Sequence, residues 1–166
     1  WVEIDLKTLP GNARAVKRAL KPGVGFMAVV KADGYGHGAA AAARTALKNG
    51  ADCLGTLTAD EGAELRENFP RAEIHLLAPS LPEEARSIAA NGLIPCADSI
   101  ELVKALDRAA SAPLRYNLAI DLGLRRWGVG PDAAADFLRR TLPFKKTRLR
   151  GLCAHRIEIE PEEARV

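Results

Sequence analysis

Short β-branched runs alternate with helical patterns along this chain, and this alternation most limits the folds it can adopt. The runs lie at 26–32, 51–58, 72–78, 93–97, 114–120 and 147–155. Steps of roughly 20 to 30 residues from strand to strand predict parallel strands joined by right-handed helical crossovers. We expect an earlier helix over about residues 6–20, before the first strand. The pattern therefore predicts an α/β protein.

Capping residues mark the predicted helix boundaries. The predicted helix starts are Thr58 with Glu61 and Ser80 with Glu83, both at capping-box spacing, and Asp98 as an N-cap. Asn49-Gly50 and Asn91-Gly92 are predicted to end two helices, because a left-handed residue often follows a helix and glycine adopts that conformation without strain. Each pair leads directly into a predicted strand, so helices and strands follow one another without a linker.

Two architectures fit this order: an open doubly wound sheet and part of a (β/α)8 barrel. A dinucleotide-binding sheet carries G-x-G-x-x-G after its first strand, whereas the similar letters at 23–28 lead into a strand, and no P-loop occurs. A barrel remains, with functional groups at the C-terminal ends of its strands, where Lys31, Asp121 and His155 lie. Six strands cannot close an eight-stranded barrel, so we expect a partial barrel from a larger polypeptide.

The sequence "VVKADGYGHG" at 29–38 places a lysine at the end of the first predicted strand. Alternation puts Met27, Val29 and Lys31 on one face, so the amine would emerge from an apolar floor. Burial there favours the neutral amine that an imine-forming nucleophile needs. The glycines of the motif permit tight turns, and Tyr35 offers a phenol to an anion. The other reading of these residues is a solvated lysine before a glycine turn.

Composition excludes several other classes of protein. With 166 residues and a net charge of +3, the chain lacks the concentrated positive charge of a nucleic-acid binder. Three cysteines lie far apart in the sequence and without a C-x-x-C pair, which favours reduced thiols over disulfides or a metal site. No apolar run approaches the roughly 20 residues of a membrane span, and the start lacks the features of a signal peptide. Because the sequence does not begin with Met, we expect that the chain has been trimmed.

The motif "AVVKADGYGHG" resembles the pyridoxal-phosphate lysine motif of the alanine racemase family, the fold-type III enzymes with an N-terminal (β/α)8 barrel. The opening "WVEIDLKTLPGNARAVK" is similar to the family's start. "IDLGLRRWGV" and "LRGLCAH" resemble two later family segments, in the family's order and spacing. The resemblance implies that residues 1–166 are the incomplete N-terminal cofactor-binding barrel domain, about six strand-helix units, without the C-terminal β domain.

The resemblance also implies roles for four residues. Lys31 would hold pyridoxal 5'-phosphate as an internal aldimine and act as one of two acid-base groups, and Tyr35 would donate to the cofactor phosphate. Arg126 would lie near the cofactor's phenolic oxygen and the substrate carboxylate, and His155 would pack against the pyridine ring. The cofactor stabilises a carbanion at Cα, while the protein supplies a base on each face.

The sequence departs from the family in several places. Many members carry a carbamylated lysine seven positions before the arginine, where this chain has Ala119, so a bound anion or a neighbouring carboxylate is expected to orient Arg126. After His155 the family continues with small apolar residues, whereas this chain reads "RIEIEPEEARV". The second base, a tyrosine of the absent β domain from the neighbouring subunit, has no counterpart here. Tyr116 lies within a predicted strand and is expected to pack in the core.

The remaining candidate residues are expected to be structural. His75 lies in mid-strand and is expected to be packed, and Asp121 is expected to cap a turn at Gly123, with a supporting role at the site as the alternative. His37 is expected to steady the glycine-rich loop that follows Lys31, which is called the lysine loop below. The basic segment 144–150 lacks interleaved aromatic residues and is expected to be a solvated loop entering a strand, and Glu162 and Glu163 are expected at the surface.

Two functions of different classes follow from this resemblance. The first is a pyridoxal-phosphate-dependent alanine racemase, a cytoplasmic homodimer that supplies D-alanine for peptidoglycan and has no nucleic-acid, membrane or metal partner. The second is a non-catalytic pyridoxal-phosphate-binding barrel that serves cofactor homeostasis, although such proteins lack the "KADGYGHG" context. A plain interaction module is a more distant third. The resemblance implies that residues 1–166 alone are inactive.

Overall fold

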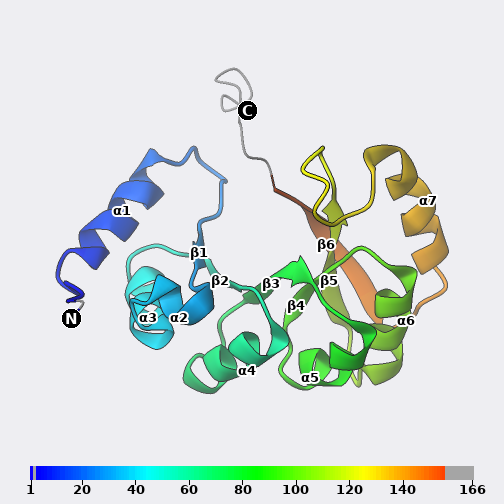
Figure 1. Ribbon diagram of the computed structural model, residues 1–166, viewed down its shortest axis with the longest axis horizontal. Coiled ribbons are helices and arrows are strands. Elements are labelled where there is room, and N and C mark those ends of the chain that lie inside the picture. Colours follow the sequence, from blue (N-terminus) through cyan, green and yellow to red (C-terminus); the bar gives the residue numbers. More distant parts are fainter. Residues whose placement is uncertain (2, 156–166) are drawn as a thin grey trace. The chain divides into compact units, whose positions relative to one another are not determined.

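Six strands alternate with helices in the computed structural model, which describes residue 1 and residues 3–155. The chain divides into two units, Trp1–Leu77 and Ala78–Val166. The expected alternation is confirmed in both units, and the predicted strand at 114–120 is found with the same bounds. Figure 1 labels these elements and colours them in chain order, from blue at the N-terminus to red at the C-terminus.

The first unit is built on parallel pairing of β1 with β2 and of β2 with β3, with Met27 opposite Cys53 and Leu54 opposite Ile74. Its strands are β1 (Met27–Val29), β2 (Cys53–Thr56) and β3, which begins here and spans Ile74–Pro79. Its helical elements are α1 (Leu9–Ala19), α2 (Lys31–Tyr35), α3 (Ala39–Lys48) and α4 (Ala59–Asn68). Helices α1 and α3 lie against each other beside β1 (Figure 1).

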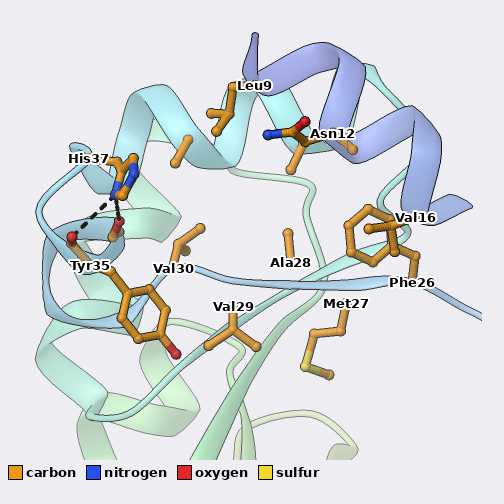
Figure 2. A pocket seen from close by; sticks show the side chains of 14 residues that line it. Leu9, Asn12, Val16, Phe26, Met27, Ala28, Val29, Val30, Tyr35 and His37 are labelled. Carbon is orange, nitrogen blue, oxygen red and sulfur yellow. Dashed lines mark hydrogen bonds between the residues drawn. The ribbon is translucent and has the colours of Figure 1, made fainter. Parts of the chain in front are cut away.

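Alternate side chains of the β1 segment point to opposite sides of the strand, as its extended backbone requires. Ala28 and Val30 are buried and point toward the side that α1 occupies, while Met27 and Val29 point the other way (Figure 2). Gly55 on β2 makes room for Met27, because a Cβ there would lie 2.8 Å from the Met27 sulfur. The expected apolar floor before the lysine is therefore present.

The second unit pairs β5 in parallel with β4 and with β6. Its elements are the short 3₁₀ helix η1 (Pro82–Glu84), α5 (Ala85–Ala90), β4 (Ile94–Ala97), α6 (Ile100–Ala109), β5 (Leu114–Ile120), α7 (Pro131–Thr141) and β6 (Thr147–Ala154). A register shift follows Tyr116, which pairs with Leu149, whereas Asn117 pairs with Gly151. The core here includes Leu102, Leu106 and Leu118, all fully buried.

The helix boundaries agree in part with the capping predictions. At α4, the Glu61 N–H donates to the Thr58 hydroxyl and the Thr58 N–H donates to the Glu61 carboxylate, both at 3.3 Å, which confirms the predicted capping box. Helices α3 and α5 end as expected, with Gly50 and Gly92 at positive φ.

Two predicted caps are wrong by one residue. The Leu81 N–H donates to the Glu84 carboxylate at 2.7 Å, so the helical segment begins one position later than the predicted pair of Ser80 and Glu83. The N-cap of α6 is Ser99, whose hydroxyl accepts the Leu102 N–H, and not Asp98. Asp98 and Ser99 are adjacent polar residues of similar capping propensity, so sequence alone does not choose between them. At the other site Glu83 and Glu84 are adjacent, and the second of them makes the contact.

Among the described residues, no helix is both long and apolar enough to cross a membrane.

Candidate functional site

Lys31 lies two residues after Val29, the last residue of β1, and is half-buried. The Val30 N–H donates to the Gly55 carbonyl of β2 at 2.8 Å, which holds the chain to the sheet one residue before the lysine. The strand itself ends at Val29, so β1 is shorter than the predicted run at 26–32. The backbone leaves the extended region at Val30, with φ −127° and ψ 24°. The predicted position at the C-terminal end of a strand is confirmed.

The segment labelled α2 is a left-handed turn, not a right-handed helix. Ala32, Asp33, Gly34 and Tyr35 have φ between 50° and 62°, and Gly36 follows at 79°. Left-handed backbone costs about 1–2 kcal/mol for each residue other than glycine. Gly34 is also buried, and a Cβ there would lie 3.3 Å from the Ala39 backbone. Strain of this kind is typical of functional loops.

Hydrogen bonds within the loop stabilise this turn. The Asp33 carboxylate accepts the Ala39 N–H at 2.7 Å, at the start of α3, and the Asp33 carbonyl accepts the Gly38 N–H at 2.9 Å. His37 Nδ1 lies 3.0 Å from the Gly34 carbonyl, and it carries the proton because a carbonyl only accepts (Figure 2). The expected steadying role of His37 is thereby supported.

Tyr35 and Lys31 lie together at this loop. The Lys31 amine is 5.6 Å from the centroid of the Tyr35 ring, within cation–π range. The Tyr35 side chain is 60% exposed, and its ring lies on the same side of β1 as Val29 and Met27 (Figure 2). A half-buried lysine and a largely exposed tyrosine therefore lie together at the end of the strand.

A pocket of about 550 Å³ adjoins the loop on the side of α1. Its lining is mostly apolar, from α1, β1 and α3, with Asn12, Tyr35 and His37 as polar members (Figure 2). Lys31 does not line it. The Lys31 side chain is therefore not part of this apolar pocket.

Glu61 is predicted from the sequence only as part of a helix cap, and in the structure its carboxylate also accepts a hydrogen bond from the lysine loop. Its Oε1 accepts the Ala32 N–H at 2.7 Å, next to Lys31. The only sequence signal for Glu61 was its capping spacing, which points to Thr58 and not to residue 32.

In the second unit, Arg126 lies in the loop between β5 and α7. The Asp121 carboxylate accepts the Gly123 N–H at 2.9 Å and the Arg125 N–H at 3.0 Å, which confirms the predicted turn. Arg126 is exposed, and its guanidinium carbon lies 3.7 Å from the centroid of the Trp127 ring. Ala119 is only 2% exposed and carries no charge, and the Trp127 ring is a contact that restrains this arginine.

His155 follows β6 directly and is exposed. Cys153, two residues earlier, receives a hydrogen bond from the Cys96 thiol, which lowers the Cys153 pKa to about 7, while this bond and burial raise the pKa of Cys96. Both thiols are free. The contact joins β4 and β6, and the sequence spacing gave no sign of it.

The other candidates behave as expected where they are described. His75 is buried, 1% exposed, with Nε2 3.0 Å from the Glu73 carboxylate, so it is the packed histidine that was predicted. Tyr116 is also buried, and its hydroxyl lies 3.1 Å from the Thr141 hydroxyl.

The basic segment 144–150 enters β6 at Thr147, as expected. Residues 162 and 163 lie outside the described residues. Within the described part of the chain, no cluster of three metal-binding side chains occurs.

Curated relatives of this chain carry the name alanine racemase. The protein from Desulfovibrio desulfuricans is 35% identical over 158 residues, covering 93% of this chain and 43% of its own length. The protein from Synechocystis sp. is 39% identical over 159 residues, covering 93% of this chain and 43% of its own length. The solved structure of alanine racemase from Corynebacterium glutamicum matches with a TM-score of 0.86 at 28% identity, covering 98% of this chain and 48% of that one. The chain spans less than half the length of these relatives.

The fold match confirms the expected class, an α/β partial (β/α)8 barrel of six strand-helix steps. Lys31 and Tyr35 come together in the first unit, and Arg126 and His155 follow strands of the second. Because the family described as "Alanine racemase, N-terminal domain" matches residues 4–165, nearly the whole sequence, this chain belongs to the alanine racemase family.

Proposed function

We propose that the full-length protein carrying this chain interconverts L- and D-alanine, with pyridoxal 5'-phosphate bound covalently through Lys31. The observation that carries the proposal is Lys31 itself, a half-buried amine at the C-terminal end of β1 beside a strained loop. The relatives named alanine racemase support the choice of reaction.

The residues present fit the cofactor. An accessible amine is the group that forms an imine with an aldehyde, and Lys31 supplies one. A phenol donates to a phosphate oxygen, and Tyr35, which is largely exposed, supplies a phenol. The two side chains lie at one loop, with the amine 5.6 Å from the ring centroid. Tyr35 and Lys31 would hold the cofactor in the first unit, and the family resemblance leads us to propose Arg126 and His155 as further cofactor-binding residues.

The cofactor, when bound, supplies the electron sink that makes the substrate Cα–H acidic. Lys31 then removes or returns a proton on one face of Cα through its Nζ atom. Arg126, whose guanidinium lies over the Trp127 ring, would bind the substrate carboxylate and orient the Cα–H bond. We assign no second base among the described residues, and we propose that a tyrosine of a C-terminal domain in a homodimer supplies it.

The proposed compartment is the cytoplasm, and no nucleic acid or membrane is a proposed partner.

The experiment is borohydride reduction of the full-length protein with pyridoxal phosphate, followed by peptide mapping and a racemisation assay. We expect the reduced adduct on Lys31 and interconversion of alanine enantiomers. Lys31→Ala should lose both, whereas Lys48→Ala, which removes an exposed lysine from the last turn of α3, should keep both. An adduct on another lysine would refute the assignment. An adduct on Lys31 without racemisation would favour the non-catalytic cofactor-binding barrel.

A further inference from the structure

The Glu61 carboxylate, in the first turn of α4, is bound by donors from two segments of the first unit. Its Oε1 accepts the Ala32 N–H of the lysine loop at 2.7 Å. Its Oε2 accepts the Thr56 hydroxyl at 2.6 Å and the Leu57 and Thr58 N–H groups at 2.9 and 3.3 Å. One side chain therefore connects the end of β2, the start of α4 and the peptide that follows Lys31.

These donors keep Glu61 ionised. Partial burial alone would raise the pKa of Glu61, but hydrogen bonds from Thr56, Ala32, Leu57 and Thr58 outweigh burial and bring the pKa below its usual value. The helix N-terminus also favours a negative charge in the first turn. A charged acceptor makes each of these hydrogen bonds stronger than a neutral one.

The lysine loop needs bonds of this kind. Three residues other than glycine, Ala32, Asp33 and Tyr35, are in left-handed conformation, and each opposes the native turn by about 1–2 kcal/mol. Packing beneath the loop is incomplete, because a cavity of about 240 Å³ lies between it and α4, with Asp33, Thr56 and Glu61 in its lining. The Glu61 contact crosses this gap and reaches the residue adjacent to Lys31.

We infer that Glu61 is a positioning residue for Lys31, which fixes the left-handed turn so that the amine is held ready to react with an aldehyde cofactor. The inference rests on the proposed function only for the identity of that cofactor. The positioning itself is a property of the first unit and is measurable without any ligand.

The first test is the backbone amide signal of Ala32 in ¹H–¹⁵N spectra of the ¹⁵N-labelled full-length protein without cofactor. A carboxylate acceptor shifts such a proton downfield, so Glu61→Gln and Glu61→Ala should move the signal upfield. The glutamine has a single acceptor oxygen and cannot serve both the loop and the α4 turn. Glu67→Gln, an exposed change on the same helix, should leave the signal in place. An unchanged Ala32 signal in both Glu61 variants would overturn the inference.

The second test is the rate at which pyridoxal 5'-phosphate forms its imine with Lys31, followed by absorbance and located by borohydride trapping. Loss of one charge-assisted bond should slow this rate about tenfold in Glu61→Gln. Thr58→Ala removes the reciprocal cap of α4 but leaves the Glu61–Ala32 bond, so it should lower stability without slowing the reaction. Equal rates in the parent and both Glu61 variants would contradict the inference.

The two tests also separate this inference from the proposed function. If the parent forms no adduct at Lys31, the proposed function fails, and the Ala32 signal alone decides whether Glu61 holds the loop. If Thr58→Ala slows the reaction as much as Glu61→Gln, the effect belongs to the stability of α4, and the positioning role is refuted.

Discussion

The guanidinium of Arg126 stacks on the indole of Trp127, the next residue, with its carbon 3.7 Å from the ring centroid. From the family resemblance a charged partner of this arginine is expected at position 119, where this chain has the buried and uncharged Ala119. A planar guanidinium on an aromatic face is held by cation–π attraction and by stacking. The indole therefore restrains this guanidinium, and an anion or a carboxylate that orients Arg126 stays a prediction.

We predict that Arg126→Lys lowers kcat/KM for alanine by about tenfold or more in the full-length protein, because an ammonium cannot reproduce a planar, two-pronged donor. Steady-state kinetics in both directions would measure the effect. Arg125→Lys is the matched control, since Arg125 is exposed in the same loop and its own backbone N–H, which any residue keeps, bonds Asp121. Parent-like kinetics in Arg126→Lys would remove Arg126 from the proposed site.

The same loop depends on a close backbone approach at Gly128. A Cβ there would lie 2.7 Å from the Asp121 nitrogen and 2.9 Å from the Ile120 carbonyl carbon. Gly123 has nearly the same φ, +105° against +109°, but nothing within 4 Å of its Cβ position. We predict that Gly128→Ala lowers the free energy of unfolding by about 2 kcal/mol more than Gly123→Ala, because backbone strain is similar in both and only the clash differs. Urea unfolding would test this, and equal losses would contradict it.

The thiol pair predicts a pH-dependent reactivity. The Cys96 thiol donates to Cys153 and brings the Cys153 pKa to about 7, so Cys153 is protonated below this pH and a thiolate above it. Since the thiolate is the nucleophile, alkylation of Cys153 by iodoacetamide should rise with pH to half its limit near pH 7. Mass spectrometry of the Cys153 peptide would follow the rate. Cys96→Ala should move the midpoint upward, and Cys53→Ser should not; an unmoved midpoint in Cys96→Ala would refute the pairing.

We predict that residues 1–166 expressed alone self-associate and do not racemise alanine. Among the described strands, β1 pairs with β2 and β6 pairs with β5, which leaves one side of each open to other chains. Leu149 and Leu152 on β6 are 42% and 65% exposed. Light scattering after size-exclusion chromatography and a D-alanine assay would test both points. Leu152→Lys should reduce association, and a parent fragment that is monomeric and active would contradict the prediction.

The sequence determined the features that depend on neighbours within a few residues. Alternating β-branched runs and helical patterns predicted all six strands, and the spacing of Thr58 and Glu61 predicted their reciprocal cap. The turn at Asp121 was predicted for the same reason, because its carboxylate reaches the N–H two residues later. The predicted caps were wrong by one residue at Asp98, where its polar neighbour Ser99 caps α6, and at Ser80, where Leu81 and Glu84 form the contact.

Tertiary structure alone decided the contacts between distant residues. The bond between Ala32 and Glu61 joins positions 29 residues apart, and the contact of Cys96 with Cys153 joins two different strands. Local preference also opposes the left-handed backbone of Ala32, Asp33 and Tyr35, which their residue types disfavour. Such features require strand register and packing to bring the stabilising groups together first. Local propensity acts over a few residues, whereas the cost of a strained turn is offset only by partners that the folded chain supplies.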